Sequence, residues 1–441
     1  MSRRENAAGL IDSILLIITR IGANFLALAW TLLLVRLLQP EAAGIAIQAI
    51  SVAQILSILV TLNVESASVT VIVPARQHER HAEAASYIRF NRNIMLLTLP
   101  ALASVALAAY LLGVRMPETP ATIASIAIAV VLVALARLSS RHATALGVMR
   151  KGMLPRMLTG PVVLTAGLGL AYLAGIPLLP WHVVLLFALS EGLTVIIQNL
   201  LLRRDFAFLK EHREPAGDRL RWTGLGLWLT PGLVMTEYRK AILIATTGLV
   251  LTGAETSLFA VAFSIINFIN FGISAVDVAF SPRIAQAMAA NQPQRRDKLL
   301  AAAMAIKVAG WVLGAALVLC IGQMALGWFG PEYRAADNAL LIMLLIPAVL
   351  IVCGPSSMLL SSGGFGRADF VGNLLGAIAC IGAITGLGWL YGVTGAAAGT
   401  VIAQVVQQTV MMIQCRNRLG FAGSLSCLRH LAPGPRAPMA T

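Results

Sequence analysis

Apolar residues fall in long runs of close to 20 residues, separated by short polar segments. A helix of about 20 apolar residues spans the roughly 30 Å hydrocarbon core of a bilayer. The runs lack the alternation of a membrane β-strand, and a helix satisfies its own backbone hydrogen bonds in lipid. The pattern therefore predicts an all-α polytopic membrane protein with about twelve transmembrane helices. The expected spans are 11–34, 44–73, 93–113, 120–136, 157–175, 183–202, 223–250, 258–280, 300–321, 337–360, 371–391 and 394–414.

Composition supports lipid as the main solvent of this chain. Of its 441 residues, 58% are hydrophobic and only 12% are charged, whereas soluble domains carry about 25% charged residues. The first apolar run has no small-residue cleavage site after its basic start, so we interpret it as an uncleaved first helix.

The basic residues indicate an orientation. The net charge of +14 would suggest nucleic acid on a soluble chain, but here most Arg and Lys residues lie between apolar runs. Alternate connections and the two termini hold 26 of them, and the other connections hold only Arg36, Arg115 and Arg334. This positive-inside bias predicts a multi-pass protein of the bacterial inner membrane with both termini in the cytoplasm and no nucleic-acid partner. The cytoplasmic set includes Arg137, Arg141 and Arg156, assigned to the loop after the fourth span.

The chain divides into two similar halves at its longest connection between spans. RLLQPEAAGIAIQA follows the first span and VLTGAETSLFAVAF follows the seventh, which aligns Glu41 with Glu255. Two parallel repeats predict pseudo-symmetric six-helix lobes around a central cavity at the midplane. The expected parts are an N-terminal lobe at 1–202, a basic cytoplasmic linker at 203–222, a C-terminal lobe at 223–414 and a cytoplasmic tail at 415–441.

Cationic side chains within the spans are candidates for substrate binding. A central Arg or Lys costs roughly 2.5–3.5 kcal/mol on insertion scales, so each needs a partner or a wet cavity. A cationic cavity would hold an anionic headgroup, because the Arg fork bonds two phosphate oxygens at once. The alternative is that Glu237 neutralises Lys240 within one helix and that Lys307 snorkels. The candidate cations are Arg20, Arg239, Lys240 and Lys307.

Acidic residues within the spans have two interpretations. They carry coupling protons or ions, or they pair with an Arg or a basic loop residue. These acids are Glu65, Glu191, Glu237 and Asp277, and the polar residues Asn63, Asn373 and Gln404 are expected to bond between helices or line a wet cavity. Pro231 is expected to bend the seventh span or to leave an ordinary kink. Metal-ligand spacing and an acid pair presented in an external loop are both lacking, so we expect no metal, no cofactor and no enzymatic activity.

Four short motifs resemble one known family. They are R-L-L-Q-P-E with Gly44, Pro282-Arg283-Ile284-Ala285, Phe329-Gly330-Pro331-Glu332-Tyr333 with Ala336, and Y-G-V-T-G-A-A from Tyr391. Their order and spacing resemble the polysaccharide (oligosaccharide-lipid) flippases of the multidrug/oligosaccharidyl-lipid/polysaccharide superfamily, although Gln39 and Ala43 depart from the usual glycine and aromatic residue. The glycines and prolines of these motifs serve tight turns and close helix approach.

The resemblance implies a flippase for a polyprenyl-diphosphate glycan, working by alternating access in cell-surface polysaccharide biosynthesis. Its partners would be the lipid-linked oligosaccharide, the bilayer and other glycan assembly proteins. One alternative is a drug or organic-cation antiporter of the same superfamily, which should place acids rather than Arg20 at mid-depth in the first helix. Another is a membrane enzyme or a non-transporting component of a glycan assembly complex.

The predicted orientation can be tested by cysteine labelling from outside the cell on a cysteine-free background. Cysteines replacing Glu41, Glu118 and Glu332 should react with an impermeant maleimide, because these turns lie on the external side. A cysteine replacing Glu211 should react only after the membrane is permeabilised. External labelling at position 211 would reverse the orientation.

Overall fold

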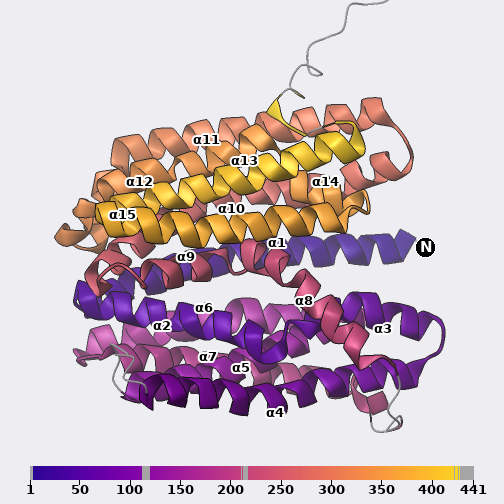
Figure 1. Ribbon diagram of the computed structural model, residues 1–441, viewed down its shortest axis with the longest axis horizontal. Helices are drawn as coiled ribbons and strands as arrows, with labels where there is room; N and C mark the ends of the chain where they lie inside the picture. Colours follow the sequence, from indigo (N-terminus) through magenta and orange to yellow (C-terminus); the bar gives the residue numbers. More distant parts are fainter. Residues whose placement is uncertain are drawn as a thin grey trace, which may run out of the picture. The chain divides into compact units, whose positions relative to one another are not determined.

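A computed structural model describes residues 3–111, 120–209, 211, 217–421, 423–425 and 427, without the side chains of residues 3–18, 20, 101–111 and 278. The described chain is built from helices that run side by side within each part (Figure 1). The first six traverses are α1 (Arg3–Leu37), α2 (Pro40–Thr61) continued by η1 (Val64–Ala67) and α3 (Ser68–Gln77), α4 (His81–Leu111), α5 (Pro120–Ala145), α6 (Met149–Ala174) and α7 (Pro180–Leu202).

The remaining traverses follow a short 3-10 helix, η2 (Ala207–Leu209). The seventh is made of two helices, the tenth of several short ones, and α15 contains the last two traverses. These elements are α8 (Arg219–Thr236) with α9 (Arg239–Thr247), α10 (Gly253–Ala289), α11 (Pro293–Phe329), η3 (Pro331–Ala336) with α12 (Asp337–Met343), α13 (Leu345–Cys353) and α14 (Ser356–Ser362), and α15 (Gly366–Leu419).

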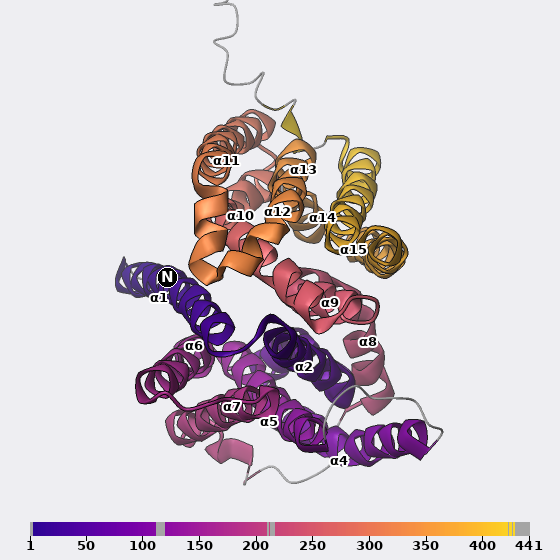
Figure 2. The same ribbon diagram turned by 90° about the vertical axis from the view of Figure 1, so that its left-hand side faces the viewer.

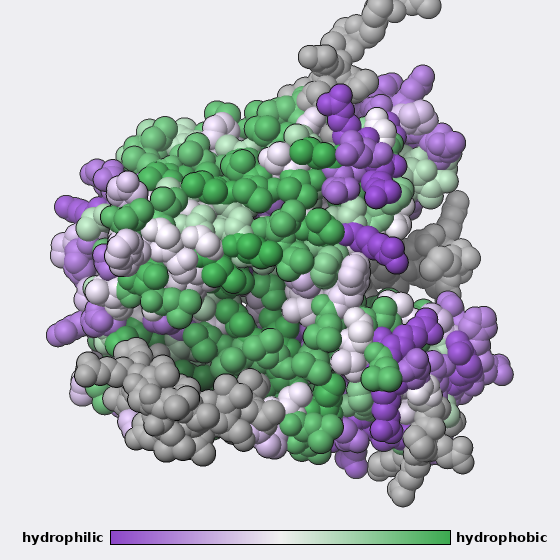
Figure 3. Space-filling view, viewed as in Figure 1, coloured by the Kyte–Doolittle hydropathy of each residue, from purple (hydrophilic) through white to green (hydrophobic). Residues whose placement is uncertain are grey.

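Length and hydropathy fit a bilayer. Within the described residues, eight helical segments are long and apolar enough to cross a membrane, and one of them, α15, is a merged pair of helices. Many large apolar side chains are exposed on these helices, among them Leu173 at 83% and Trp389 at 77%. Apolar side chains cover the flanks of the helices, and hydrophilic ones gather at the helix ends (Figure 3). Lipid is the solvent that accommodates such flanks.

The helices form two compact units. The first unit comprises Met1–Gly248 and Thr252–Ser257, and the second comprises Leu249–Leu251 and Leu258–Thr441. In the first unit α5, α6 and α7 pack against one another, α2 packs on α5, and α1 packs on α6 (Figure 2). The unit limits differ from the lobe limits predicted at 203–222, because α8 packs on η1 and α9 packs on α2. The division into repeats at the linker stays a prediction.

Three of the predicted spans are interrupted. The second span breaks after Thr61, the seventh breaks between α8 and α9, and the tenth is split at Leu344 and Gly354. α8 continues past Pro231 to Thr236, and the interruption of the seventh traverse follows at Glu237 and Tyr238. A proline within a helix removes one hydrogen bond and can be tolerated in a transmembrane helix when neighbouring groups satisfy the freed carbonyl. The break between α8 and α9 is held by the side-chain contacts described below.

The last two traverses form a tight antiparallel hairpin, as the Y-G-x-x-G-A-A motif led us to expect. α15 is interrupted at Tyr391 and Gly392, where the glycine has φ 59° and ψ −141°. Beyond this turn the two arms touch through glycine. A Cβ on Gly395 would lie 1.9 Å from the Leu387 carbonyl oxygen, and one on Gly399 would lie 2.6 Å from that of Ala383. Small residues thus allow the backbones to pack directly, as in other membrane helix pairs.

The turn before α2 is also built on a close approach. A Cβ on Gly44 would lie 1.8 Å from the Gly253 carbonyl oxygen. The Glu41 carboxylate accepts hydrogen bonds from the backbone N–H groups of Gly253 (3.1 Å) and Ala254 (2.7 Å), the first residues of α10. A carboxylate at a helix N-terminus is favoured by the helix dipole. Both motif residues, Glu41 and Gly44, therefore serve to seat the start of α10, and these contacts lie within the first unit.

The hairpin gives a direct test of close packing. We expect Gly395→Ala to lower the melting temperature of the detergent-solubilised protein, because the added methyl group must displace the backbone of the opposite arm, at a cost of about 1–3 kcal/mol. Gly382→Ala is the matched control, because nothing lies within 4 Å of a Cβ at that position. Equal melting temperatures for the two variants would contradict the close contact.

Candidate functional site

The second traverse is interrupted inside the first unit, where the chain is buried. α2 ends at Thr61, and Leu62 (φ 48°) and Asn63 (φ 53°) adopt the left-handed conformation. Asparagine enters this region readily, but a leucine there is uncommon and needs support from its surroundings. The Asn63 backbone N–H donates to the Ile58 carbonyl at 3.1 Å, and its side-chain amide donates to the Gly226 carbonyl of α8 at 3.3 Å. The break is therefore held by local and long-range hydrogen bonds.

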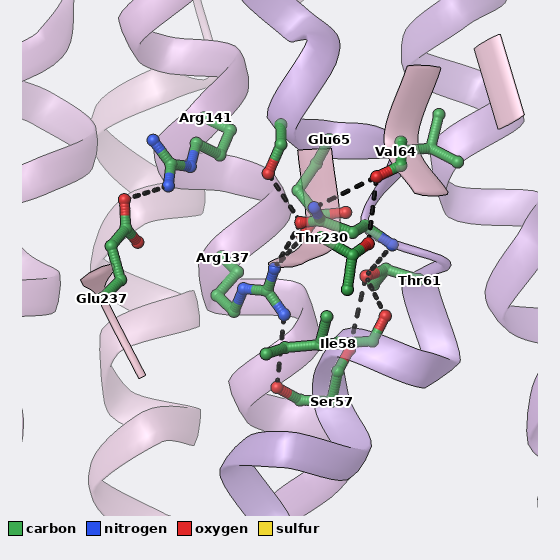
Figure 4. A network of polar contacts seen from close by, with 12 residues as sticks. Ser57, Ile58, Thr61, Val64, Glu65, Arg137, Arg141, Thr230 and Glu237 are labelled. Atoms are coloured by element: carbon green, nitrogen blue, oxygen red, sulfur yellow. Dashed lines mark hydrogen bonds and ion pairs between the residues drawn. The ribbon is translucent and has the colours of Figure 1, made fainter. Parts of the chain in front are cut away.

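Arg137 of α5 connects the two sides of this break (Figure 4). Its Nη1 donates to Ser57 Oγ at 3.4 Å, and its Nη2 donates to Asn63 Oδ1 at 3.1 Å and forms an ion pair with Glu65. The Arg137 side chain is 1% exposed and that of Glu65 is 0% exposed. Either charge alone would be costly at this depth, so each depends on the other. Of the two interpretations of Glu65, pairing is the one this geometry shows.

The position of Arg137 corrects the predicted loop after the fourth span. Arg137 and Arg141 lie within α5, and Arg156 lies within α6. The apolar run ends at Arg137, but α5 continues to Ala145, and Gly147 (φ 80°) lies in the turn that follows. The helix continues through polar residues because their partners are on other elements, which a hydropathy window along the chain does not detect.

The break in the seventh traverse is bound to the same helices. Glu237 and Tyr238 separate α8 from α9, and Arg141 forms an ion pair with Glu237 (Figure 4). Arg156 Nη2 donates to the Tyr238 hydroxyl at 2.7 Å. The Arg137 guanidinium carbon lies 5.2 Å from the centre of the Tyr238 ring, within cation–π range. α5 and α6 thus fix both breaks.

Glu191 of α7 completes the group, because it interacts electrostatically with Arg156. The exposure changes across the cluster: Arg141 and Glu237 are 28% and 40% exposed, whereas Glu65 and Arg137 are sealed. The cluster therefore has a closed end and an open end. We call this set the buried charge cluster, and it consists of Glu65, Arg137, Arg141, Arg156, Glu191, Glu237 and Tyr238.

The structure describes two of the three predicted cations of the first and seventh spans. Arg239 and Lys240 begin α9, next to Tyr238, and both are half-buried. Lys240 Nζ lies 6.0 Å from the centre of the Trp30 ring in α1. The Arg20 side chain lies outside the described part of the chain. The structure therefore brings three predicted acids together with Arg239 and Lys240 nearby, and a meeting of Arg20 with Arg239 stays a prediction.

Lys307 and Asp277 form an ion pair inside the second unit, between α11 and α10. Lys307 is 3% exposed, so it does not snorkel, and Asp277 is 35% exposed. One turn away on each helix, Ile273 and Met304 belong to an apolar cluster of the core. The charge of Lys307 is compensated within its own unit, which weakens its claim as a substrate-binding cation.

Of the polar residues expected to bond between helices in the last two traverses, Asn373 does so and Gln404 does not, within the part of the chain that the structure describes. Gln407 Nε2 donates to Asn373 Oδ1 at 2.9 Å between the two arms of α15. Gln404 is 1% exposed, and both polar atoms of its amide lack a hydrogen-bond partner among the described residues.

Sequence reasoning missed Arg137, Arg141 and Arg156 as members of this cluster. One signal was available: Arg137 and Arg141 are four residues apart, so a helix that continued to Gly147 would present both on one face. The partners of these side chains could not be predicted, because Glu65 and Glu237 are 72 and 96 residues away along the chain.

The cluster and the start of α9 have a positive balance. Among the side chains that the structure describes, this set comprises five cations and three carboxylates. The cations are Arg137, Arg141, Arg156, Arg239 and Lys240, and the carboxylates are Glu65, Glu191 and Glu237. Buried guanidinium groups present their N–H donors in a planar fork, and this geometry suits anions, phosphate above all. Among the residues that the structure describes, no three His, Cys, Asp or Glu side chains gather as metal ligands would.

Comparison with known proteins identifies the fold. No protein-family model and no curated protein matches the sequence. The chain is similar to an inward-facing multidrug resistance MATE family transporter of the MOP superfamily, with 14% identity, 95% of this chain and 100% of the other covered, and a TM-score of 0.70. It is also similar to the lipid II flippase MurJ in an inward closed conformation, with 11% identity, 91% and 87% covered, and a TM-score of 0.59.

At such identities the likeness shows the fold alone. The predicted fold class is confirmed: the chain is an all-helical multi-pass membrane protein with the twelve-helix, two-lobe architecture of these transporters. The structures that share it are transporters, and both a drug transporter and a lipid flippase are among them.

The sealed ion pair gives a stability prediction. We expect Glu65→Gln to lower the melting temperature and the yield of folded protein strongly, because loss of one partner leaves Arg137 as an uncompensated buried charge, at a cost of about 3–5 kcal/mol. The double replacement Glu65→Leu with Arg137→Met should recover most of the loss, since it removes both charges.

Glu237→Gln is the comparison variant, because its pair is partly exposed and should contribute about 1 kcal/mol or less. Melting should be followed for all variants in one detergent. A Glu65→Gln protein that melts with the wild type would show that the pair does not hold the break.

Proposed function

We propose that the protein is a flippase that translocates a lipid-linked oligosaccharide, a polyprenyl-diphosphate glycan, across the bacterial inner membrane. The observation that carries this proposal is the excess of cations over carboxylates in the buried charge cluster and the start of α9. The four sequence motifs and the likeness to a lipid II flippase support the substrate class. The bilayer and other glycan assembly proteins would be its partners.

The charge balance suits a diphosphate headgroup. A diphosphate brings several oxygens and at least two negative charges, and planar guanidinium forks bind such oxygens in pairs. Arg141 at the open end of the cluster and Arg239 beside it are the half-buried cations that we assign to first contact. The polyprenyl chain would remain in lipid. The protein needs no covalent chemistry for this step, only differential binding in two states.

The breaks in the second and seventh traverses give the proposal a mechanical basis. A helix bends where its hydrogen-bond ladder is interrupted, and both interruptions are tied to α5 by ion pairs. We propose that binding of the headgroup competes for Arg141 and so changes the angle between α8 and α9. Alternating access between the halves would follow, with both termini on the cytoplasmic side.

The rival function is export of drugs or organic cations. The higher TM-score with a MATE family transporter, 0.70 against 0.59 for MurJ, favours it. Fold does not decide substrate, however, because the site does. A carrier of cations needs carboxylates to receive them, and here Glu65 and Glu237 each form an ion pair with an Arg.

Reconstituted vesicles distinguish these functions. The purified protein should be placed in vesicles that contain a polyprenyl-diphosphate glycan with a fluorescent label on the sugar, and an impermeant quencher should be added outside. We expect the protected inner pool to become quenchable at a rate proportional to protein content. Uptake of tetraphenylphosphonium without lipid flipping would instead establish a cation antiporter, and neither activity would leave a non-transporting component.

Charge reversal at the proposed site should separate binding from folding. We expect Arg239→Glu and Arg20→Glu to reduce flipping about tenfold or more with normal protein levels, because one lost charge-assisted contact to phosphate is worth about 1.5–3 kcal/mol. Arg239→Lys should keep partial activity, since a point charge replaces the fork.

Arg203→Glu is the matched control, because Arg203 is exposed after the end of α7. It should flip at the wild-type rate. Stable Arg20→Glu and Arg239→Glu proteins with normal flipping would remove both residues from the site, and a loss of protein level rescued by a second reversal at Glu237 would assign Arg239 to internal pairing.

A further inference from the structure

A second basic site lies at one end of the first unit, apart from the buried charge cluster. It is a pocket of about 390 Å³ among the ends of several helices. Arg76 of the last turn of α3 and His81 at the start of α4 form one wall, and Leu146 in the α5–α6 turn forms another. Arg204 and Phe208, which follow α7, close it. The pocket is thus at the level where the membrane traverses end.

The pocket lining is cationic. Its single carboxylate, Asp205, accepts a hydrogen bond from Lys151 Nζ at 2.8 Å and is already paired. Arg76 and Arg204 are exposed and contribute two guanidinium groups, and His81 is half-buried beside them. These side chains can therefore form charge-assisted hydrogen bonds with an anionic ligand.

The walls of the pocket are fixed by hydrogen bonds. Arg76 Nη1 donates to the Leu146 carbonyl at 3.1 Å, and this bond holds the turn at Gly147. Arg89 Nη1 donates to the Leu209 carbonyl at 3.0 Å, which holds η2 against α4 and places Phe208 in the wall. A guanidinium has five N–H donors, so Arg76 keeps others for a ligand. The site is preformed, which lowers the entropy cost of binding.

Apolar surface adjoins the cationic lining. Leu146, Val148 and Phe208 line the pocket itself. A small soluble anion gains nothing from apolar walls, whereas a phospholipid presents a phosphate with acyl chains attached. Basic pockets between helix ends on the basic side of a membrane protein bind anionic lipid headgroups.

We propose that this pocket binds the phosphate of an anionic phospholipid, with Arg76 and Arg204 on the phosphate oxygens and Leu146 and Phe208 against the glycerol and upper acyl chain. The bound lipid would join the loop before α4 to the segment after α7. This role is independent of the proposed transport activity, since the pocket shares no residue with the buried charge cluster.

Native mass spectrometry of the full-length protein can test the site. The protein should be released from nanodiscs of mixed phosphatidylglycerol and phosphatidylcholine, and the retained lipids should be counted. We expect preferential retention of phosphatidylglycerol by the wild type and about a tenfold weaker preference in Arg204→Gln, which leaves the Arg76 contact with Leu146 intact. Arg76→Gln with Arg204→Gln should abolish the preference.

The matched control is Arg203→Gln with Arg219→Gln, which removes two exposed charges outside the pocket. It should change the preference by less than about twofold, because such residues act only through the diffuse surface field. An equal loss in this control, or no loss in Arg204→Gln, would overturn the proposal.

A second measurement separates the two sources of phosphate. Inorganic phosphate should be titrated into wild-type protein in phosphatidylcholine nanodiscs and followed by ³¹P line broadening. We expect no broadening that depends on Arg204. Saturable phosphate binding that Arg204→Gln abolishes, without a preference for phosphatidylglycerol, would assign the pocket to a soluble anion and overturn the lipid proposal.

Discussion

The interior of the first unit depends on the buried ion pair between Arg137 and Glu65. Neither charge is tolerable alone at this depth, and the pair is completed by the Asn63 amide, which also anchors α8. The interruption of the second traverse brings α8 very close, because a Cβ on Gly226 would lie 2.7 Å from Val64 Cα. The ion pair, the helix break and the packing of α8 therefore depend on one another. Loss of any one of these contacts leaves buried polar or charged groups without partners in an apolar environment.

α5 acts as the common support of two broken helices. Arg137 and Arg141, one turn apart, reach the break in the second traverse and the break in the seventh. The predicted second repeat would begin with the seventh traverse, yet the packing of that traverse assigns it to the first unit. The predicted repeats and the packing units thus divide the chain at different places, and they differ over α8 and α9.

The apolar pattern was sufficient to predict the helical membrane fold, because membrane spanning leaves a signal in every window of about 20 residues. The motif glycines were also informative: Gly395 and Gly44 make the close approaches that their spacing suggested. The candidate site could be predicted only in part. The acids were visible as costly residues in apolar runs, but Arg137 stood at the end of such a run and was assigned to a loop. Pairing across 72 residues depends on tertiary packing, which no local property of the sequence reports.

The unequal exposure of the two ion pairs makes them differ in their response to ionic strength. Mobile ions screen charges over about 8 Å at physiological salt, but only where water reaches them. The Arg141–Glu237 pair is 28% and 40% exposed, and where water reaches it the pair weakens as salt rises, whereas the sealed Arg137–Glu65 pair is not screened in this way. The joint between α8 and α9 is consequently the one that dissolved ions can soften, while the joint in the second traverse stays rigid under the same change.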